Sequence, residues 1–364
     1  MSVRAWRRCS DRKRLLGPGR RGRPDFLPDS MSQLAPQMAL YGSERPLAAL
    51  PPCVHYAGSE RFIRKALTLQ AERGPVFDIA CDCEDGAAVG GERAHAVVMA
   101  GLIGSDLNRY SRVGARVHDV HHPAWQAEVD VLLDGAGDRI AFLTLPKAEC
   151  VADVERFLAH VADRVAQLGL RRTIPASVLI ETPGAVHDAW TITALPGVVS
   201  LDFGLMDFVS AHHGAIPGSA MVSPGQFEHP LIRHAKCEIA LAALAHGVVP
   251  VHNVTRALDD PAQAYADARR ARDEFGFLRM WSIHPAQIDG IVAALGLDTA
   301  EVASAAEIIA AARDAGWGPL RIDGQMHDRA SYRQAWTLLQ RAHAAGIELP
   351  AIAAAHFADG GAAS

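Results

Sequence analysis

Short apolar runs alternate along most of this chain with longer stretches in which apolar residues have helical spacing. Eight runs rich in β-branched and apolar residues predict strands: Cys53–Tyr56, Phe77–Cys83, Ala115–Val120, Ile140–Leu145, Ser177–Glu181, Val198–Phe203, Val248–His252 and Leu278–Ile283. Between most of them lie amphipathic stretches such as Ser59–Arg73, Cys150–Leu168 and Gln226–His246. This alternation predicts a parallel sheet covered by helices.

The number of strands favours a closed α/β structure, the (β/α)8 or TIM barrel. A doubly wound open sheet is the alternative, but no glycine-rich dinucleotide fingerprint follows the first strand. Two helical segments, Ala300–Ala315 and Ser331–Ala345, follow the eighth strand. We therefore expect a barrel over residues 46–297, a C-terminal helical lid segment over 298–347 and a flexible tail over 348–364.

The N-terminal segment 1–45 differs in composition from the rest of the chain. It is rich in Arg, Pro, Gly and Ser and has no sustained apolar period, which predicts disorder. Residues 1–23 carry a formal charge of +8, which leaves −13 on the remainder of a chain whose net charge is −5. Met31 is an alternative start, and a transit peptide is a rival interpretation of the Arg-rich stretch.

Deletion of residues 1–30 is expected to leave the protein soluble and folded, because these residues lack the apolar content needed to join a core. Gel filtration and circular dichroism of the truncated chain check this. Insoluble protein would show that the segment contributes to the fold.

Composition and charge exclude several classes of protein. The acidic body has no clustered cations for nucleic acid, and no apolar run reaches the ~18–20 residues that span a bilayer. No apolar segment of a secretory signal follows the basic N-terminus. The six cysteines fit no zinc-site spacing, so we expect reduced thiols and a cytoplasmic protein. Cys81 and Cys83 face the same way on one strand, which favours core packing.

Charged residues gather where the predicted strands end. The carboxyl ends of barrel strands meet at one rim, where active sites of this fold lie. The residues near that rim are Asp82, Glu84, Asp85, Arg116, Lys147, Glu181, Asp207 and His284. Crowded carboxylates repel one another unless a cation compensates them. Oxygen ligands with room for water suit Mg2+, so the pattern predicts a magnesium site.

Each of these residues also has a structural interpretation. Glu181, which precedes Thr182-Pro183-Gly184, could cap the next helix, and Asp207 could be a helix N-cap. The acidic stretch 82–85 could be a polar strand end. Arg116 lies between apolar residues of a strand, where a guanidinium needs an anionic substrate or a facing carboxylate.

Seven ordered motifs over residues 45–345 make the chain resemble the citrate lyase β-subunit-like branch of the HpcH/HpaI aldolase/citrate lyase superfamily. The motifs are the acidic strand end Asp82–Asp85, the Arg116 strand, Leu145-Pro146-Lys147, Ile180-Glu181-Thr182, Phe203-Gly204 with Asp207, Ile283-His284-Pro285 with Gln287, and Asp323–Asp328. The resemblance implies a TIM barrel of the phosphoenolpyruvate/pyruvate-domain type. It also implies a carbon–carbon lyase that uses Mg2+, with Mn2+ as a substitute, on CoA thioesters.

The resemblance further implies roles for individual residues. Glu181 and Asp207 match the carboxylates that ligate Mg2+. Glu84 and Asp85 match acids near the water shell of the metal. Arg116 matches the arginine that stabilises an enolate.

Other implied roles concern the substrate and the neighbouring subunit. Lys147 and His284 lie where the family places CoA contacts. Asp328 matches an aspartate that closes over a neighbouring subunit's site and handles the proton, which implies a homotrimer or a multiple of one. N-capping of the helix from Ser331 is the alternative for Asp328.

The chain departs from the family pattern at several positions. His118-Asp119 replaces a common Asn, His121 and His122 follow, and His212-His213 comes after Asp207. The loop 216–226 is rich in Gly, Ser and Pro and could cover the site. These differences leave open which acyl group is the substrate.

Three rival functions remain open on the sequence alone. A citryl lyase subunit that depends on a phosphopantetheine-bearing carrier protein would share all these residues. A metal-dependent pyruvate aldolase also pairs Glu with Asp, although the segment with Asp328 argues against it. A non-catalytic binding barrel is disfavoured by the joint presence of Glu181, Asp207, Arg116 and Asp328.

Overall fold

Eight parallel strands close into a barrel in the computed structural model, which describes residues 35–42, 47–86, 88–258, 260–345 and 347–358. The strands are β1 (Cys53–Ala57), β2 (Phe77–Asp82), β3 (Val113–Arg116), β4 (Ile140–Leu145), β5 (Ala176–Ile180), β6 (Val198–Phe203), β7 (Val249–His252) and β8 (Arg279–Ser282). Each strand pairs with the next, and β8 pairs with β1 to complete the ring. The predicted TIM barrel is confirmed.

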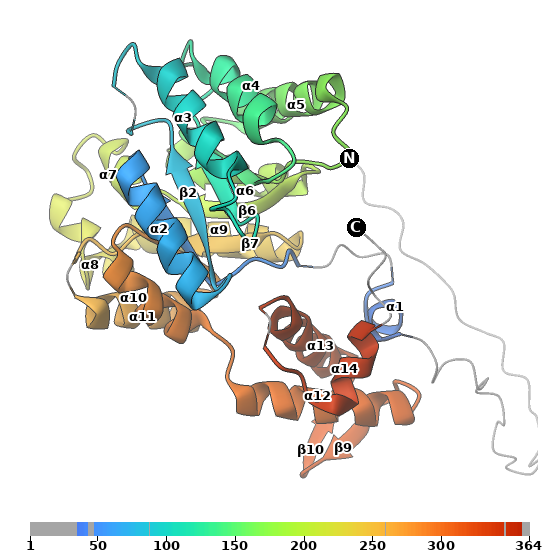
Figure 1. Ribbon diagram of the computed structural model, residues 1–364. Helices are drawn as coiled ribbons and strands as arrows, with labels where there is room; N and C mark the ends of the chain where they lie inside the picture. Colours follow the sequence, from blue (N-terminus) through green and yellow to red (C-terminus); the bar gives the residue numbers. More distant parts are fainter. Residues whose placement is uncertain (1–34, 43–46, 87, 259, 346, 359–364) are drawn as a thin grey trace, which may run out of the picture.

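Helices cover the outside of the barrel (Figure 1). They are α2 (Glu60–Arg73), α3 (Glu92–Gly104), α4 (Trp125–Ala136), α5 (Val151–Leu168), α6 (Pro183–Ala194), α7 (Leu205–Ser210), α9 (Pro230–Ala245), α10 (Pro261–Phe275) and α11 (Pro285–Leu295). The loop after α7 contains the 3-10 helix η1 (Gly218–Met221) and the short helix α8 (Gly225–Glu228). The main core lies between this helical layer and the strands.

Side chains along each strand point alternately into the barrel and toward the surrounding helices. Val54, Ala80, Phe142, Val251 and Trp281 form a separate apolar cluster inside the barrel. The other strand face, which includes Cys81 and Cys83, packs in the main core against the helices. Burial raises the pKa of both thiols well above the usual range, so they stay protonated. The predicted packing role of this cysteine pair is confirmed.

The third strand lies earlier than the predicted Ala115–Val120. Val117 is buried, but β3 ends at Arg116 and the chain then leaves the sheet. There the backbone N–H of His118 donates to Glu128 Oε2 at 3.0 Å, so a buried carboxylate on α4 replaces a neighbouring strand. Apolar character alone does not distinguish a buried strand from a buried turn.

The C-terminal extension forms its own lobe beside the barrel (Figure 1). It consists of α12 (Thr299–Asp314), the antiparallel hairpin of β9 (Leu320–Ile322) and β10 (Gln325–His327), α13 (Arg329–Ala344) and α14 (Ala351–Ala358). The lobe has a separate hydrophobic core. Helix α14 lies where we expected a flexible tail. It is ordered because Ala353 is buried and Phe357 stacks on Trp336 with 4.9 Å between ring centroids.

The prediction that residues 1–45 are disordered is wrong for one short segment. Pro36–Leu40 forms helix α1 within the segment predicted to be disordered, and it packs on α13. The Tyr41 hydroxyl donates to the carbonyl oxygen of Arg333 at 2.8 Å. Residues 1–34 and 43–46 lie outside the described part of the chain. Within the described part, no helix is both long and apolar enough to cross a membrane.

Candidate active site

The strand ends bring most of the predicted site residues together around one pocket. Asp82 and Arg116 are paired in the register of β2 and β3, and Glu181 directly follows β5. The pocket has a volume of ≈ 220 Å³. Its lining comprises Tyr56, Asp85, Arg116, Leu179, Glu181, Phe203, Gly204, Leu205, Met206, Asp207, Met221, Asn253, Val254, Arg256, Trp281 and Ile283.

Arg116 is held by three carboxylates from the end of β2 and the turn that follows. Its Nε lies 2.8 Å from Asp82 Oδ1, its Nη1 2.7 Å from Glu84 Oε2 and its Nη2 2.9 Å from Asp85 Oδ2. The Tyr56 hydroxyl also donates to Asp82, at 2.8 Å. Burial alone would raise the pKa of Asp82, but Arg116 and Tyr56 hold it below the usual value. The guanidinium is therefore fixed at the wall of the pocket.

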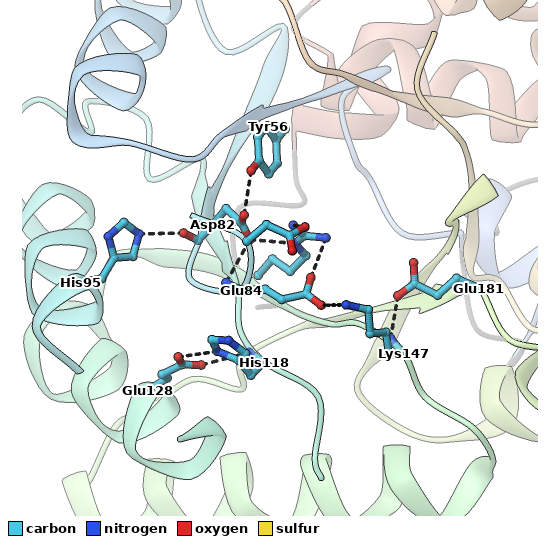
Figure 2. Close-up of polar contacts among 10 residues, drawn as sticks. Tyr56, Asp82, Glu84, His95, His118, Glu128, Lys147 and Glu181 are labelled. Atoms are coloured by element: carbon cyan, nitrogen blue, oxygen red, sulfur yellow. Dashed lines mark hydrogen bonds and ion pairs between the residues drawn. The ribbon is translucent and has the colours of Figure 1, made fainter. Parts of the chain in front are cut away.

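Lys147 connects two of the predicted acids, as Figure 2 shows. Its ammonium group pairs with Glu84, and its backbone N–H donates to Glu181 Oε1 at 2.7 Å. The backbone of Lys147 is in the left-handed region, with a φ of 50°. Lys147 does not line the pocket, so the structure places it as a neighbour of the acids.

Glu181 is the most unusual carboxylate of the site. It is only 2% exposed, and burial followed by repulsion from Asp207 raises its pKa to about 8. Among the described residues only Oε1 receives a hydrogen bond. Thr182 caps α6 by accepting from Ala185 N at 3.0 Å, so the capping interpretation of Glu181 is wrong. A buried carboxylate beside a second one is a position that a cation would stabilise.

Asp207 lies in the first turn of α7, whose N-cap is Gly204, and its side chain lines the pocket. The capping interpretation of Asp207 is therefore also wrong. Glu181 and Asp207 are the only two acids that the described chain offers here besides those bound by Arg116, and no group of three or more His, Cys, Asp or Glu in it could hold a metal. Two carboxylates with water and substrate oxygens fit Mg2+, which usually keeps several waters in proteins.

Gly204→Ala is expected to lower activity by at least about tenfold while the barrel remains folded. A Cβ at this position would lie 2.1 Å from Glu181 Oε2 and 2.6 Å from Glu181 Cβ, so the carboxylate would have to move. Steady-state kinetics and circular dichroism check this. Gly101→Ala is the control, because nothing lies within 4 Å of its added Cβ. Equal kinetics of the two variants would show that the position of Glu181 is unimportant.

The structure does not bring His284 and Asp328 into this pocket. His284 is the N-cap of α11 and accepts from Ala286 N at 3.3 Å. Asp328 is the N-cap of α13 and accepts from Ala330 N at 3.0 Å. Both residues therefore have a capping role within their own chain, and a role of Asp328 in a neighbouring subunit's site stays a prediction.

The histidines that depart from the family pattern also lie outside the pocket lining. His118 pairs with the buried Glu128 at 2.7 Å and stacks on His122 with 3.9 Å between centroids. His121 lies 3.3 Å from Asp153. Of the loop 216–226, Met221 alone reaches the pocket. His118, His121 and His122 therefore contact neighbours outside the pocket.

Four lining residues that carry side-chain nitrogen or oxygen atoms were not predicted from the sequence: Tyr56, Asn253, Arg256 and Trp281. Tyr56 ends the predicted first strand, and Asn253 directly follows the seventh, so the rule applied to the other strand ends could have found both. Arg256 lies in the loop beyond β7, and no pattern in the sequence indicates that it lines the pocket.

Comparison with known protein sequences shows which family the chain belongs to. The family model of the HpcH/HpaI aldolase/citrate lyase family matches residues 78–285. The L-malyl-CoA/beta-methylmalyl-CoA lyase of Rhodobacter capsulatus is 29% identical over 66% of this chain and 78% of that protein. A citrate lyase subunit beta-like protein of Deinococcus radiodurans is 31% identical over 62% of this chain and 74% of its own length.

Solved structures agree with the fold. A citrate lyase from Burkholderia xenovorans is 49% identical, with a TM-score of 0.79 over 89% of this chain and 100% of that one. The CitE protein of Mycobacterium tuberculosis, solved with magnesium, acetoacetate and coenzyme A, is 24% identical with a TM-score of 0.58 over 81% of this chain and 99% of its own, a likeness in fold. The chain is a carbon–carbon lyase, and it belongs to the HpcH/HpaI aldolase/citrate lyase family.

Proposed function

We propose that this protein is a Mg2+-dependent lyase that cleaves or forms a carbon–carbon bond in a 3-hydroxyacyl-CoA thioester. The observation that carries the proposal is the buried Glu181, which has a raised pKa, faces Asp207 and lies in the same pocket as Arg116. The name of the Rhodobacter relative supports the substrate class. When bound, the metal would supply positive charge to oxygen atoms of the substrate.

The three partners of Arg116 differ in how firmly they hold it. The side chains of Asp82 and Glu84 are 0% and 5% exposed, whereas that of Asp85 is 69% exposed. Exposed ion pairs contribute little stability, so Asp85 is the partner that a substrate oxygen can displace. Arg116 would then donate from Nη2 to the thioester carbonyl oxygen.

Cleavage requires a proton to leave the substrate hydroxyl group. The electron pair of the broken carbon–carbon bond moves onto the thioester fragment, and the resulting enolate places negative charge on the carbonyl oxygen beside Arg116. A proton returned to the enolate carbon completes the acyl-CoA product. We propose Asp328 of a neighbouring subunit as the proton carrier, within a homotrimer or a multiple of one.

Lys147 and His284 remain proposed CoA contacts in this scheme, since both lie beside the strand ends outside the pocket lining. Glu84 and Asp85 would order water around the metal, within the limits set by their ion pairs with Arg116. Mn2+ should substitute for Mg2+, because both accept carboxylate and water ligands.

A panel of thioesters tests the proposed function. Malyl-, methylmalyl-, citramalyl- and citryl-CoA are incubated with the protein and Mg2+, and the release of acetyl- or propionyl-CoA is measured. At least one should be cleaved. The Deinococcus relative makes a carrier-bound citryl group the alternative, so the same acyl groups on a phosphopantetheine carrier protein form a second arm. Cleavage of the carrier forms alone would exclude a CoA substrate.

The pKa of Glu181 predicts a pH-dependent stability of the metal-free protein. Because the folded state raises this pKa from 4.5 to about 8, folding favours the protonated carboxyl, and stability should fall as pH rises between these values. Mg2+ must displace the proton, so its stabilising effect should grow over the same range. Thermal unfolding with and without Mg2+ at pH 6 and 8.5 checks this. Glu181→Gln should remove the difference, and a pH-independent effect of Mg2+ would contradict the assignment.

A further inference from the structure

We propose that Arg256 binds an anionic group of the substrate, either a carboxylate of the acyl part or a phosphate of CoA. The proposal rests on the proposed function and adds a substrate-binding residue to the same pocket. Arg256 lies in the loop that follows β7 and lines the pocket together with Glu181, Asp207 and Arg116.

The charges of the pocket wall leave Arg256 without a counterion. The charged side chains of the lining are Asp85, Arg116, Glu181, Asp207 and Arg256. Arg116 is already paired with three carboxylates. Arg256, by contrast, forms no ion pair with any residue that the structure describes, and its one polar contact there is Met221 Sδ at 4.0 Å. A guanidinium whose N–H groups are not held by a carboxylate can donate hydrogen bonds to a ligand.

Buried side chains fix the backbone immediately before Arg256. Asn253 Nδ2 donates to Gln226 Oε1 at 2.8 Å, and Thr255 Oγ1 donates to Asp267 Oδ2 at 2.6 Å. All four residues are at most 2% exposed. Asp267 on α10 also accepts from Gln226 at 3.0 Å, so the loop is tied to the helical layer through one carboxylate.

The other side of Arg256 is fixed in the same way. Gln287, which is fully buried at the start of α11, donates from Nε2 to the carbonyl oxygens of Thr255 and Ala257, both at 2.9 Å. The peptide groups on both sides of Arg256 are therefore anchored. An exposed arginine on such an anchored loop, which lines the pocket and forms no ion pair with the described residues, has the features of a binding residue supported by its surroundings.

The chemistry of the substrate offers two matching anions. Malyl, citramalyl and citryl groups each end in a carboxylate, and CoA carries phosphates. Both kinds of anion accept two parallel hydrogen bonds from a guanidinium. In this proposal the acyl part enters the pocket at the strand ends, and CoA extends past the rim. Arg256 can meet either anion, and kinetics distinguish them.

Arg256→Gln and Arg256→Lys test the proposal in the condensation direction, with glyoxylate and acetyl-CoA varied separately. Arg171→Gln is the control, because Arg171 is exposed and lies outside the pocket lining. Arg256→Gln should raise the KM of one substrate by about 10- to 100-fold, with partial recovery in Arg256→Lys. A rise for glyoxylate identifies the carboxylate as the ligand, and a rise for acetyl-CoA identifies the phosphate. Unchanged KM values for both substrates overturn the proposal.

Binding without turnover separates this proposal from the proposed function. The shift in melting temperature produced by CoA and by glyoxylate is measured for the wild type and both variants. In one outcome the wild type neither cleaves nor forms a thioester, yet CoA or glyoxylate shifts its melting temperature and does not shift that of Arg256→Gln. The anion site then stands and the lyase proposal falls. If the wild type turns over while neither shift nor KM depends on Arg256, the lyase proposal stands and the anion site falls. The absence of any shift and any turnover in the wild type removes both.

Discussion

Glu181→Gln and Asp207→Asn are each expected to reduce lyase turnover by at least about 10²-fold and to weaken Mg2+ binding. Among the described residues that line the pocket, these are the two acids that Arg116 does not bind, and each substitution removes a carboxylate that would be ionised with the metal bound. Gln keeps the size of Glu181, and its amide oxygen can still accept the hydrogen bond from Lys147 N. A loss of turnover in Glu181→Gln therefore reflects the missing charge and not a change in side-chain size. Isothermal titration with Mg2+ and steady-state kinetics measure the two effects.

Chelation of the wild type should have the same consequence. EDTA should abolish turnover, and added Mg2+ should restore it, as should Mn2+. Asp106→Asn is the matched control for Asp207→Asn, because the Asp106 carboxylate is fully exposed and lies outside the pocket lining. Full activity in EDTA would remove the metal from the mechanism, and normal Mg2+ binding by both site variants would place the metal elsewhere.

Asp328→Ala should lower turnover by about 10²–10⁴-fold, the usual contribution of a general acid or base, while metal binding and assembly persist. The structure adds a second effect, since the side chain caps α13 and its removal should cost about 1 kcal/mol of stability. Asp298→Ala separates the two effects. Asp298 caps α12 of the same lobe, accepting from Ala300 N at 2.8 Å, so this variant should lose similar stability and keep its turnover.

Subunit mixing tests where Asp328 acts. The C-terminal lobe lies beside its own barrel (Figure 1), and none of the lobe residues that the structure describes lines the pocket of the same chain. Exchanged oligomers of Asp328→Ala and Arg116→Ala subunits should regain part of the activity, because some sites would combine an intact Arg116 with an intact Asp328. A turnover loss below tenfold in Asp328→Ala, or no regain after proven exchange, would leave Asp328 as a helix cap.

The period of apolar residues was sufficient to predict the barrel. Strand side chains repeat every second residue and helical ones every third or fourth, so Ile140–Leu145 and Val198–Phe203 were placed with the bounds that the structure has. The stretches with helical spacing that were predicted from Ser59 and from Cys150 also begin there, because these residues are the N-caps of α2 and α5. These features depend on neighbours in the sequence.

The sequence also placed the acids and Arg116 at one rim, since parallel strands in a barrel end together. It did not predict that Asp82, Glu84 and Asp85 all bind Arg116, because this depends on the register between β2 and β3. The raised pKa of Glu181 depends on burial and on Asp207, a residue from another strand end. The position of the loop that carries Arg256 depends on Gln226, Asp267 and Gln287, which come from three helices. Desolvation and charge pairing act through space, so only the tertiary structure decided them.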